Sequence, residues 1–301
     1  YTTLFRSNNV LGWIVFAIAS TVYLMTMEPT ASFWDCGEFI SSAYKLEVGH
    51  PPGAPFFMLT ANLFTQLASD PSTVAKMVNT MSALFSGLTI LFLFWSITHL
   101  ARKIMVKDGE EASLGQMITV MGSGLVGALA YTFSDTFWFS AVEGEVYAYS
   151  SLFTAVVFWL ILKWEAVADK PHADRWIVLI AYLMGLSIGV HLLNLLCIPA
   201  IVLVYYYKKF PNPTMKGTLI ALLVSFAIVG LMMYGVVQGL VEVCGYFELL
   251  FVNTFGMPYN SGVYAFVIIL AASLIWAIWE TMQDEIHPVR MKISFILSIV
   301  L

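Results

Sequence analysis

Charged residues are scarce in this chain: Asp, Glu, Lys and Arg make up only 11% of its 301 residues. A soluble domain has about 25% charged residues, which cover its surface. This chain is instead 59% hydrophobic, with a mean hydropathy of +0.82. These values exclude a soluble enzyme and a disordered protein, and they predict an all-α polytopic membrane protein. The net charge of -5 argues against nucleic-acid binding, because a phosphate-contacting surface should be basic.

Cysteines are few, and nucleotide-binding motifs and repeats are missing. Three cysteines are too few for a disulfide framework. No glycine-rich phosphate loop and no Walker motif is present, so the sequence predicts no nucleotide site. No repeat of fixed period is visible, which weakens the case for a transporter built from inverted repeats but leaves it open.

Long hydrophobic runs are abundant. A helix needs about 20 apolar residues to cross the hydrocarbon core of a membrane. Such runs lie near residues 10–27, 77–101, 115–133, 146–162, 217–240 and 262–279, and another begins near 291. Because the last run reaches Leu301, we expect residues 1–301 to be a single transmembrane domain at the N-terminal end of a longer protein. We interpret the first run as a signal anchor.

Two apolar segments do not have the length of one span. Residues 176–207 would form a helix about 48 Å long, and residues 54–68 are too short to cross. The distribution of basic residues resolves both. If 54–68 lies on the outer surface and 176–207 forms two short helices that meet near residues 189–194, all of the 14 Lys and Arg residues except Lys45 and Lys76 face the cytoplasm.

This topology predicts an acidic outer face. The outer segments are residues 28–76, which contain surface helices, residues 134–145, a turn around His191, and residues 241–261. These segments carry two lysines and ten of the 19 acidic residues: Glu28, Asp35, Glu38, Glu47, Asp70, Asp135, Glu143, Glu145, Glu242 and Glu248.

The first outer segment has the richest chemistry. Asp35 and Glu38 are three residues apart and would share one face of a helix that begins near Ser32, the expected N-cap. Neighbouring aromatic residues would desolvate these carboxylates and make them better bases. The alternative is that Asp35 completes the helix cap and Glu38 is simply solvated.

The sequence His50-Pro51-Pro52-Gly53 follows this acid pair. Two prolines force an extended turn, and Gly53 lets the backbone pass close to another group. On its own, this motif favours an interfacial turn whose histidine is exposed to water.

Together, FWDCGEF at residues 33–39 and GHPPG at residues 49–53 resemble the bacteroidete protein O-mannosyltransferase-like membrane family, within the GT-C glycosyltransferase superfamily. The resemblance implies a GT-C-like helix bundle and a polyprenyl-phosphate sugar donor. Asp35 matches the acid position of the classical mannosyltransferases, whose two acids are adjacent. Here Cys36 and Gly37 separate Asp35 from Glu38.

GT-C enzymes commonly place a second acid in the loop between their third and fourth spans. Glu143 and Glu145 are the corresponding candidates for binding the substrate or donor, and the sequence does not distinguish between them. Aromatic residues beside carboxylates are typical of sugar pockets. They are equally typical of the aromatic belt at a membrane interface.

His191 and Asn194 lie where residues 176–207 are expected to break. Broken helices occur in membranes where they are buried in protein or line a cavity. Polar residues at such a break are therefore candidate binding residues. Alternatively, the two side chains satisfy each other and the free carbonyl groups of the break.

A lipid carrier phosphate would need a cation or a helix N-terminus. The predicted outer face has no arginine, so the candidates are Lys45, His50 and His191, with Lys76 at the start of the second span. A part of the protein beyond this sequence is the other possible source.

The resemblance therefore predicts an enzyme of the bacterial inner membrane with its active face toward the periplasm. It would move a sugar, with mannose expected, from polyprenyl phosphate to Ser or Thr of a secreted protein, and Asp35 would act as the base. The partners are the lipid-linked donor, the acceptor protein and membrane lipid, with no nucleic acid. No metal cluster is visible in the sequence, and no cofactor is expected. A transporter and a scaffold subunit of a membrane complex are the alternative functions.

Overall fold

The computed structural model describes residues 2–107, 109–173 and 175–281. Regular secondary structure in these residues is helical throughout, which confirms the predicted all-α class. The chain divides into two compact units. One is formed by Tyr1–Lys163 and Leu183–Leu195, and the other by Trp164–Tyr182 and Leu196–Leu301. The assignment of residues 1–301 to one transmembrane domain stays a prediction.

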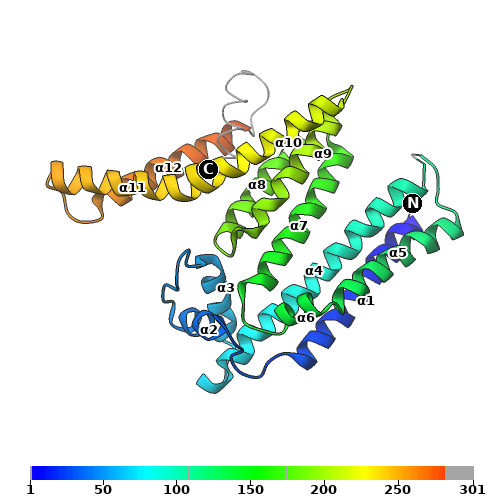
Figure 1. Cartoon of the computed structure of the whole chain (residues 1–301), viewed down its shortest axis with the longest axis horizontal. Helices are drawn as coiled ribbons and strands as arrows, with labels where there is room; N and C mark the ends of the chain where they lie inside the picture. Colours follow the sequence, from blue (N-terminus) through cyan, green and yellow to red (C-terminus); the bar gives the residue numbers. More distant parts are fainter. Residues whose placement is uncertain (1, 108, 174, 282–301) are drawn as a thin grey trace. The chain divides into compact units, whose positions relative to one another are not determined.

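Three long apolar helices form the frame of the first unit: α1 (Thr2–Thr26), α4 (Val74–Met105) and α5 (Leu114–Thr132) (Figure 1). The apolar core between them includes Val15, Ala19, Ile90, Phe94 and Val120. Gly124 allows a close helix crossing, because a Cβ atom there would lie only 2.8 Å from Phe94 Cε2. Small residues are typical of helix crossings in membrane proteins.

Short helices occupy the segment between α1 and α4. They are α2 (Cys36–Lys45), α3 (Pro55–Thr65) and η1 (Pro71–Thr73). With 11 residues, α3 is about 16 Å long and too short to cross a membrane, as predicted for this segment. A second apolar core joins α2 and α3 to α4, and it includes Phe39, Ile40, Phe57, Met58, Val78 and Met81.

The predicted outer loop 134–145 contains one short helix, α6 (Asp135–Ala141). A tight turn over residues 142–145 then leads into α7 (Val146–Val167). This turn carries both acids that the sequence singles out in the loop.

Residues 176–207 are interrupted where the sequence predicts a break. The helix α8 (Arg175–Ile188) ends before Gly189, and a short turn leads through η2 (Leu192–Cys197) into α9 (Ile198–Lys209). The predicted pair of short helices is therefore confirmed.

In the second unit, the helix that follows α9 is much longer than predicted. Four segments run on without a break: α10 (Met215–Gly230), η3 (Leu231–Gln238), α11 (Gly239–Leu249) and η4 (Leu250–Thr254). Together they span 40 residues. The helix α12 (Ser261–Thr281) returns beside α11 (Figure 1).

The structure corrects the predicted outer loop at residues 241–261, because residues 241–254 are helical and only residues 255–260 form a connection to α12. Strong helix-ending signals come only at Gly256, where φ is 66°, and at Pro258. Glu242 lies on α11, and its Oε1 atom accepts a hydrogen bond from the hydroxyl of Tyr246 at 2.8 Å. Glu248 accepts hydrogen bonds from the backbone N–H groups of Asn260, at 2.6 Å, and Gly262, at 3.0 Å, so it caps the start of α12.

Seven helices among the described residues are long and apolar enough to cross a membrane: Thr3–Thr26, Pro71–Met105, Leu114–Thr132, Val146–Val167, Leu192–Lys209, Met215–Thr254 and Ser261–Glu280. The chain is thus a multi-pass membrane protein, as predicted. The span expected to begin near residue 291 lies outside the described residues.

The predicted topology can be tested by cysteine labelling. Gln66 at the end of α3 and Glu110 in the 106–113 loop are both exposed. In sealed membranes whose outer face is accessible, a membrane-impermeant thiol reagent should label Gln66→Cys, whereas Glu110→Cys should be labelled only after the membrane is opened. The unsubstituted protein corrects for the native cysteines. Equal labelling of both variants from outside would contradict the loop assignment.

Candidate active site

Asp35 stands at the N-cap position of α2, yet its carboxylate does not cap the helix. Its backbone has φ -83° and ψ 0°, and its side chain accepts no hydrogen bond from the residues that the structure describes. The predicted N-cap at Ser32 is wrong. The chain turns sharply at Trp34, whose φ is 59°, and the helix begins only at Cys36. Asp35 is therefore left with an exposed carboxylate that is free of local bonds.

The aromatic neighbours do not desolvate Asp35. Phe33 and Trp34 are 84% and 89% exposed, and Asp35 is exposed as well. The low-dielectric surroundings that the sequence predicts for Asp35 and Glu38 are therefore not provided by the described part of the protein. Low-dielectric surroundings are found instead at Glu143 and Glu145, which are only 4% and 6% exposed.

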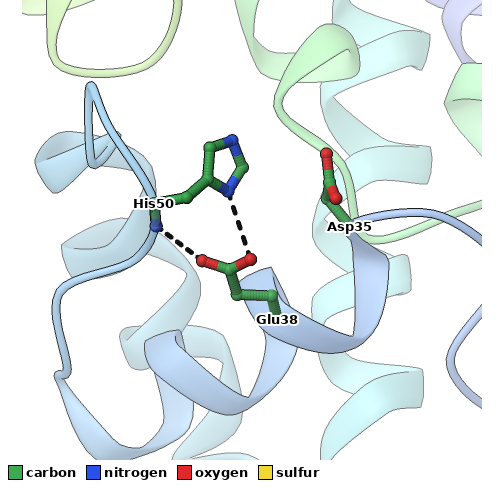
Figure 2. Close-up of side chains that lie close together, drawn as sticks. All are labelled: Asp35, Glu38 and His50. Atoms are coloured by element: carbon green, nitrogen blue, oxygen red, sulfur yellow. Dashed lines mark hydrogen bonds and ion pairs between the residues drawn. The ribbon is translucent and has the colours of Figure 1, made fainter.

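Glu38 holds the turn at His50 against α2 (Figure 2). Its Oε1 atom accepts a hydrogen bond from the backbone N–H of His50 at 2.6 Å, and its Oε2 atom lies 3.1 Å from His50 Nδ1. The bond from the backbone N–H is the main reason why the pKa of Glu38 is lowered. Glu38 is thus hydrogen-bonded within the protein, and its lowered pKa makes it a weaker base, not the stronger one that the sequence predicts.

Gly49 makes this contact possible. A Cβ atom on residue 49 would lie 3.1 Å from Glu38 Oε1 and 3.2 Å from Met58 Cε. Because a larger residue would push against both neighbours, the glycine lets the backbone before His50 approach α2 and α3 closely.

Asp35, Glu38 and His50 lie close enough together to be considered as metal ligands. One ligand atom from each falls within 4.8 Å of the other two. Two carboxylates and an imidazole are suitable ligands for several divalent cations. The three residues form a cluster only after folding, because residues 46–49 must bend back along α2. The absence of a bound metal stays a prediction from the sequence.

Glu143 and Glu145 flank the turn before α7, and the structure distinguishes between them. Desolvation raises the pKa of Glu143, and interactions with Ser32 and Cys36 oppose this effect only in part. Glu145 accepts a bond from the backbone N–H of Val146 at 3.2 Å. The two acids therefore have different neighbours, although both are buried.

Gly144, between these two acids, packs tightly against α4 and α2. A Cβ atom on residue 144 would lie 2.9 Å from Asn79 Oδ1 and 3.0 Å from Ile40 Cγ1. The buried Asn79 also donates hydrogen bonds to the carbonyl groups of Glu28 at 2.7 Å and Thr30 at 3.0 Å. Asn79 thereby fixes the start of the first outer segment beside the 142–145 turn.

Burial changes the acidity of this region. Desolvation raises the pKa of Glu145 to about 6, and it also raises the pKa of Glu143. Burial, followed by the charges of Glu143 and Glu145, raises the pKa of Cys36 to about 12. The Cys36 thiol therefore keeps its proton near neutral pH.

The helix break between α8 and η2 provides a hydrogen-bond acceptor for the N-terminus of α3. The Gly189 carbonyl accepts hydrogen bonds from the backbone N–H groups of Phe56 at 2.7 Å and Phe57 at 3.2 Å. These are amides of the first turn of α3, which have no partner within their own helix. The break near residue 189 is thus tied to the helix that follows His50.

His191 is half-buried and packs against Tyr147, with their ring centroids 5.3 Å apart. Its Nδ1 atom accepts a hydrogen bond from the backbone N–H of Leu193 at 3.1 Å, which requires an unprotonated Nδ1. Burial lowers the pKa of His191, so the ring is neutral at pH 7. His191 is consequently a weak candidate for binding a phosphate by charge.

Asn194 is buried and does not bond His191. Its Nδ2 atom donates to Ser187 Oγ at 2.9 Å, and Ser187 Oγ in turn donates to the Met184 carbonyl at 2.7 Å. These contacts link η2 to the last turn of α8. The structure therefore gives Asn194 a role within the helix break.

Lys45 is separated from the acids by the length of α2. It lies in the last turn of this 10-residue helix, about 15 Å along the axis from its start. Its Nζ atom is 3.9 Å from Glu47 Oε1, and both side chains are exposed. Of the three predicted basic candidates, the structure thus brings only His50 next to Asp35.

All eight candidate residues nevertheless lie in the first unit. The sequence missed Asn79 as the residue that anchors the first outer segment. A glycine between two acids is the one local signal of the tight turn at residues 143–145.

The model of one protein family matches residues 35–214, which is more than half of the chain. Its description is protein O-mannosyl-transferase TMEM260 N-terminal domain. The chain belongs to this family. The match confirms the resemblance to protein O-mannosyltransferases that residues 33–39 and 49–53 indicate.

Two relatives carry the name protein O-mannosyl-transferase TMEM260. The Mus musculus protein is 28% identical over 184 residues, which are 61% of this chain and 24% of the mouse protein. The Dictyostelium discoideum protein is 25% identical over 187 residues, which are 60% of this chain and 21% of that protein. The matched region thus spans about a quarter or less of each relative. No solved structure matches the chain significantly.

Replacement of Glu145 should reveal the cost of its burial. Its pKa is raised from 4.5 to about 6, so the folded protein binds this proton more tightly than the unfolded chain does. The stabilising contribution of protonated Glu145 is therefore fully present below pH 4.5, and it is lost as the pH rises through 6. Above pH 7, Glu145→Gln should be more stable than the unsubstituted protein by roughly 2 kcal/mol.

Thermal unfolding in detergent, followed by tryptophan fluorescence from pH 4 to 8, measures this difference. The gain in melting temperature should shrink as the pH falls. Glu47→Gln, which changes an exposed acid, is the matched control and should show no such trend. A Glu145→Gln variant that is less stable at every pH would show that the ionised carboxylate stabilises the fold.

Proposed function

We propose that this chain is part of a membrane glycosyltransferase that moves mannose from a polyprenyl-phosphate carrier to a Ser or Thr hydroxyl of a secreted protein. The family match supports this function over a transporter or a scaffold subunit, because the family description names a protein O-mannosyl-transferase. The observation that carries the proposal is the exposed carboxylate of Asp35, held at the start of α2 without a local hydrogen bond.

The proposed reaction is a single displacement at the anomeric carbon of the sugar. The acceptor oxygen forms the new bond to this carbon while the bond to the carrier phosphate breaks, and the phosphate leaves with the bonding electrons. The hydroxyl proton passes to Asp35. A neutral Ser or Thr hydroxyl is a weak nucleophile, so a positioned base accelerates this step. Attack opposite to the leaving group inverts the configuration of the sugar carbon.

His50 is the basic group best placed to meet the leaving phosphate. Its ring lies beside Asp35, and the carboxylate of Glu38 holds its Nδ1 side. When His50 is protonated, its Nε2–H can donate to a phosphate oxygen while Glu38 stabilises the positive charge. Glu38 thus orients His50, and Asp35 acts as the base. In a bacterial cell, this site would face the periplasm.

The Asp35→Asn substitution tests the proposed base. The amide keeps the size of the side chain but accepts no proton at neutral pH, so turnover should fall by about 10²–10⁴-fold. Glu38→Gln should have a smaller effect, because it disturbs only the orientation of His50. The measurement is transfer of mannose from polyprenyl-phosphate mannose to a Ser/Thr peptide by the full-length protein in lipid nanodiscs, detected by mass spectrometry.

Asp135→Asn is the matched control, since it changes an exposed aspartate at the start of another helix. It should keep full activity. If Asp35→Asn retains activity while Glu38→Gln loses it, the two acids have the opposite roles. Full activity of both variants, or absence of transfer by the unsubstituted protein, would contradict the proposed function.

Chelation tests the expectation that the reaction needs no metal. Both oxygens of Glu38 already interact with His50, so one of the three potential ligands is engaged within the protein. Dialysis against EDTA should therefore leave the transfer rate unchanged. A loss of activity that Mn²⁺ or Mg²⁺ restores would instead assign a cation to Asp35, Glu38 and His50.

A further inference from the structure

His191 lies in the turn between α8 and η2, and both its backbone and its ring are held in place. Its backbone N–H donates a hydrogen bond to the Ser187 carbonyl at 2.8 Å. Its Nδ1 atom accepts one from the backbone N–H of Leu193 at 3.1 Å, so the neutral ring carries its proton on Nε2. No group among the described residues accepts a hydrogen bond from this Nε2–H. The turn therefore presents an uncharged donor that the described part of the protein does not use.

Tyr147, near the start of α7, lies directly beside this histidine. The centroids of the two rings are 5.3 Å apart, and the ring planes are inclined by 57°. Tyr147 is 46% exposed, and its hydroxyl has no hydrogen-bond partner in the part of the chain that the structure describes. The pair thus offers an accessible aromatic ring and two uncharged hydrogen-bonding groups next to one another.

Packing contacts connect His191 to the residues around His50. The Gly189 carbonyl, two residues before His191, accepts a hydrogen bond from the backbone N–H of Phe57 at 3.2 Å. The ring centroid of Phe57 lies 5.4 Å from that of Phe39, which in turn lies 5.8 Å from that of His50. One short series of packed residues therefore joins the two histidines.

Tyr147 is connected to α2 by a second route. The turn that precedes it packs on this helix, because a Cβ atom on Gly144 would lie only 3.0 Å from Ile40 Cγ1. Ile40 follows Asp35 by five residues, which is about 7.5 Å along the helix axis. Both routes place the pair at the end of the first unit that carries Asp35 and His50.

The groups of this pair suit a sugar better than a phosphate. Sugar hydroxyls bind to uncharged donors and acceptors, and aromatic rings pack on the apolar faces of sugar rings. A phosphate favours charged donors. His191 is not one, because a proton on Nδ1 would displace the hydrogen bond from Leu193 and because its burial disfavours the charge. An aromatic belt at the membrane interface would explain Tyr147 but not the fixed donor beside it.

We propose that Tyr147 and His191 form a subsite for the hydroxyl groups of the transferred sugar, in which His191 acts through its uncharged Nε2–H. This inference rests on the proposed function and adds the part of the site that holds the sugar, while His50 meets the phosphate and Asp35 meets the acceptor. It replaces phosphate binding, one of the roles that the sequence suggests for His191, with recognition of the sugar itself.

Equilibrium binding of two lipids separates the sugar from the phosphate. The full-length protein in lipid nanodiscs is titrated with short-chain polyprenyl-phosphate mannose and, separately, with the same polyprenyl phosphate without a sugar, in both cases without acceptor peptide. Tyr147→Phe removes one hydroxyl and keeps the ring, and His191→Phe removes the Nε2–H. Each should raise the Kd of the mannose lipid about threefold to tenfold, the effect of one lost neutral hydrogen bond. Neither should change the Kd of the sugar-free lipid.

Tyr131→Phe is the matched control. Tyr131 is 42% exposed and lies in the last turn of α5, and its hydroxyl also has no hydrogen-bond partner among the described residues. This variant should bind both lipids like the unsubstituted protein. Thermal unfolding of each variant in the same nanodiscs shows whether it is folded at the temperature of the titration.

Three results would overturn the inference: equal affinity of the unsubstituted protein for both lipids, unchanged affinity of the two variants for the mannose lipid, or an equal loss of affinity for both lipids. The last result would assign the pair to phosphate binding or to the fold. If His191→Phe does not fold, Tyr147→Phe alone decides. A protein that prefers the mannose lipid, loses this preference in the variants and yet transfers no mannose would contradict the proposed function and leave the sugar subsite in place.

Discussion

The close contact of Gly144 with α2 and α4 determines how the acidic residues of the first unit are arranged. Because no side chain separates the 142–145 turn from Asn79 and Ile40, the two flanking glutamates enter the protein interior. The burial of these two acids results from this contact, whereas Asp35 stays exposed.

Glu38, Glu145 and Asp35 have the same functional group but lie in different surroundings. Glu38 is exposed and bonded to His50, which favours its ionised form. Glu145 is buried, which disfavours ionisation. Asp35 is exposed, and its carboxylate accepts no hydrogen bond from the described residues. Burial and hydrogen bonding, rather than residue type, thus give these carboxylates different properties.

Properties set by short stretches of sequence were predictable. The membrane class follows from hydropathy, and the break near Gly189 follows from the excess length of residues 176–207. The motifs around Asp35 and His50 correctly indicated the family. Features that depend on contacts between distant residues were not predictable. The burial of Glu143 requires α2 and α4 to be in place, and the helix through residues 241–254 continues because its first strong stop signals come at Gly256 and Pro258. The start of α2 at Cys36 depends on the backbone at Trp34.

The hydrogen bonds from Phe56 and Phe57 to the Gly189 carbonyl constrain the order in which the protein can be completed during synthesis. The first turn of α3 leaves the ribosome long before residue 189 does, so its amides must first be satisfied by water or lipid head groups. Only when α8 has been inserted does the carbonyl that replaces them become available. The region that follows His50 therefore reaches its final form late, after at least four of the long apolar helices have been made.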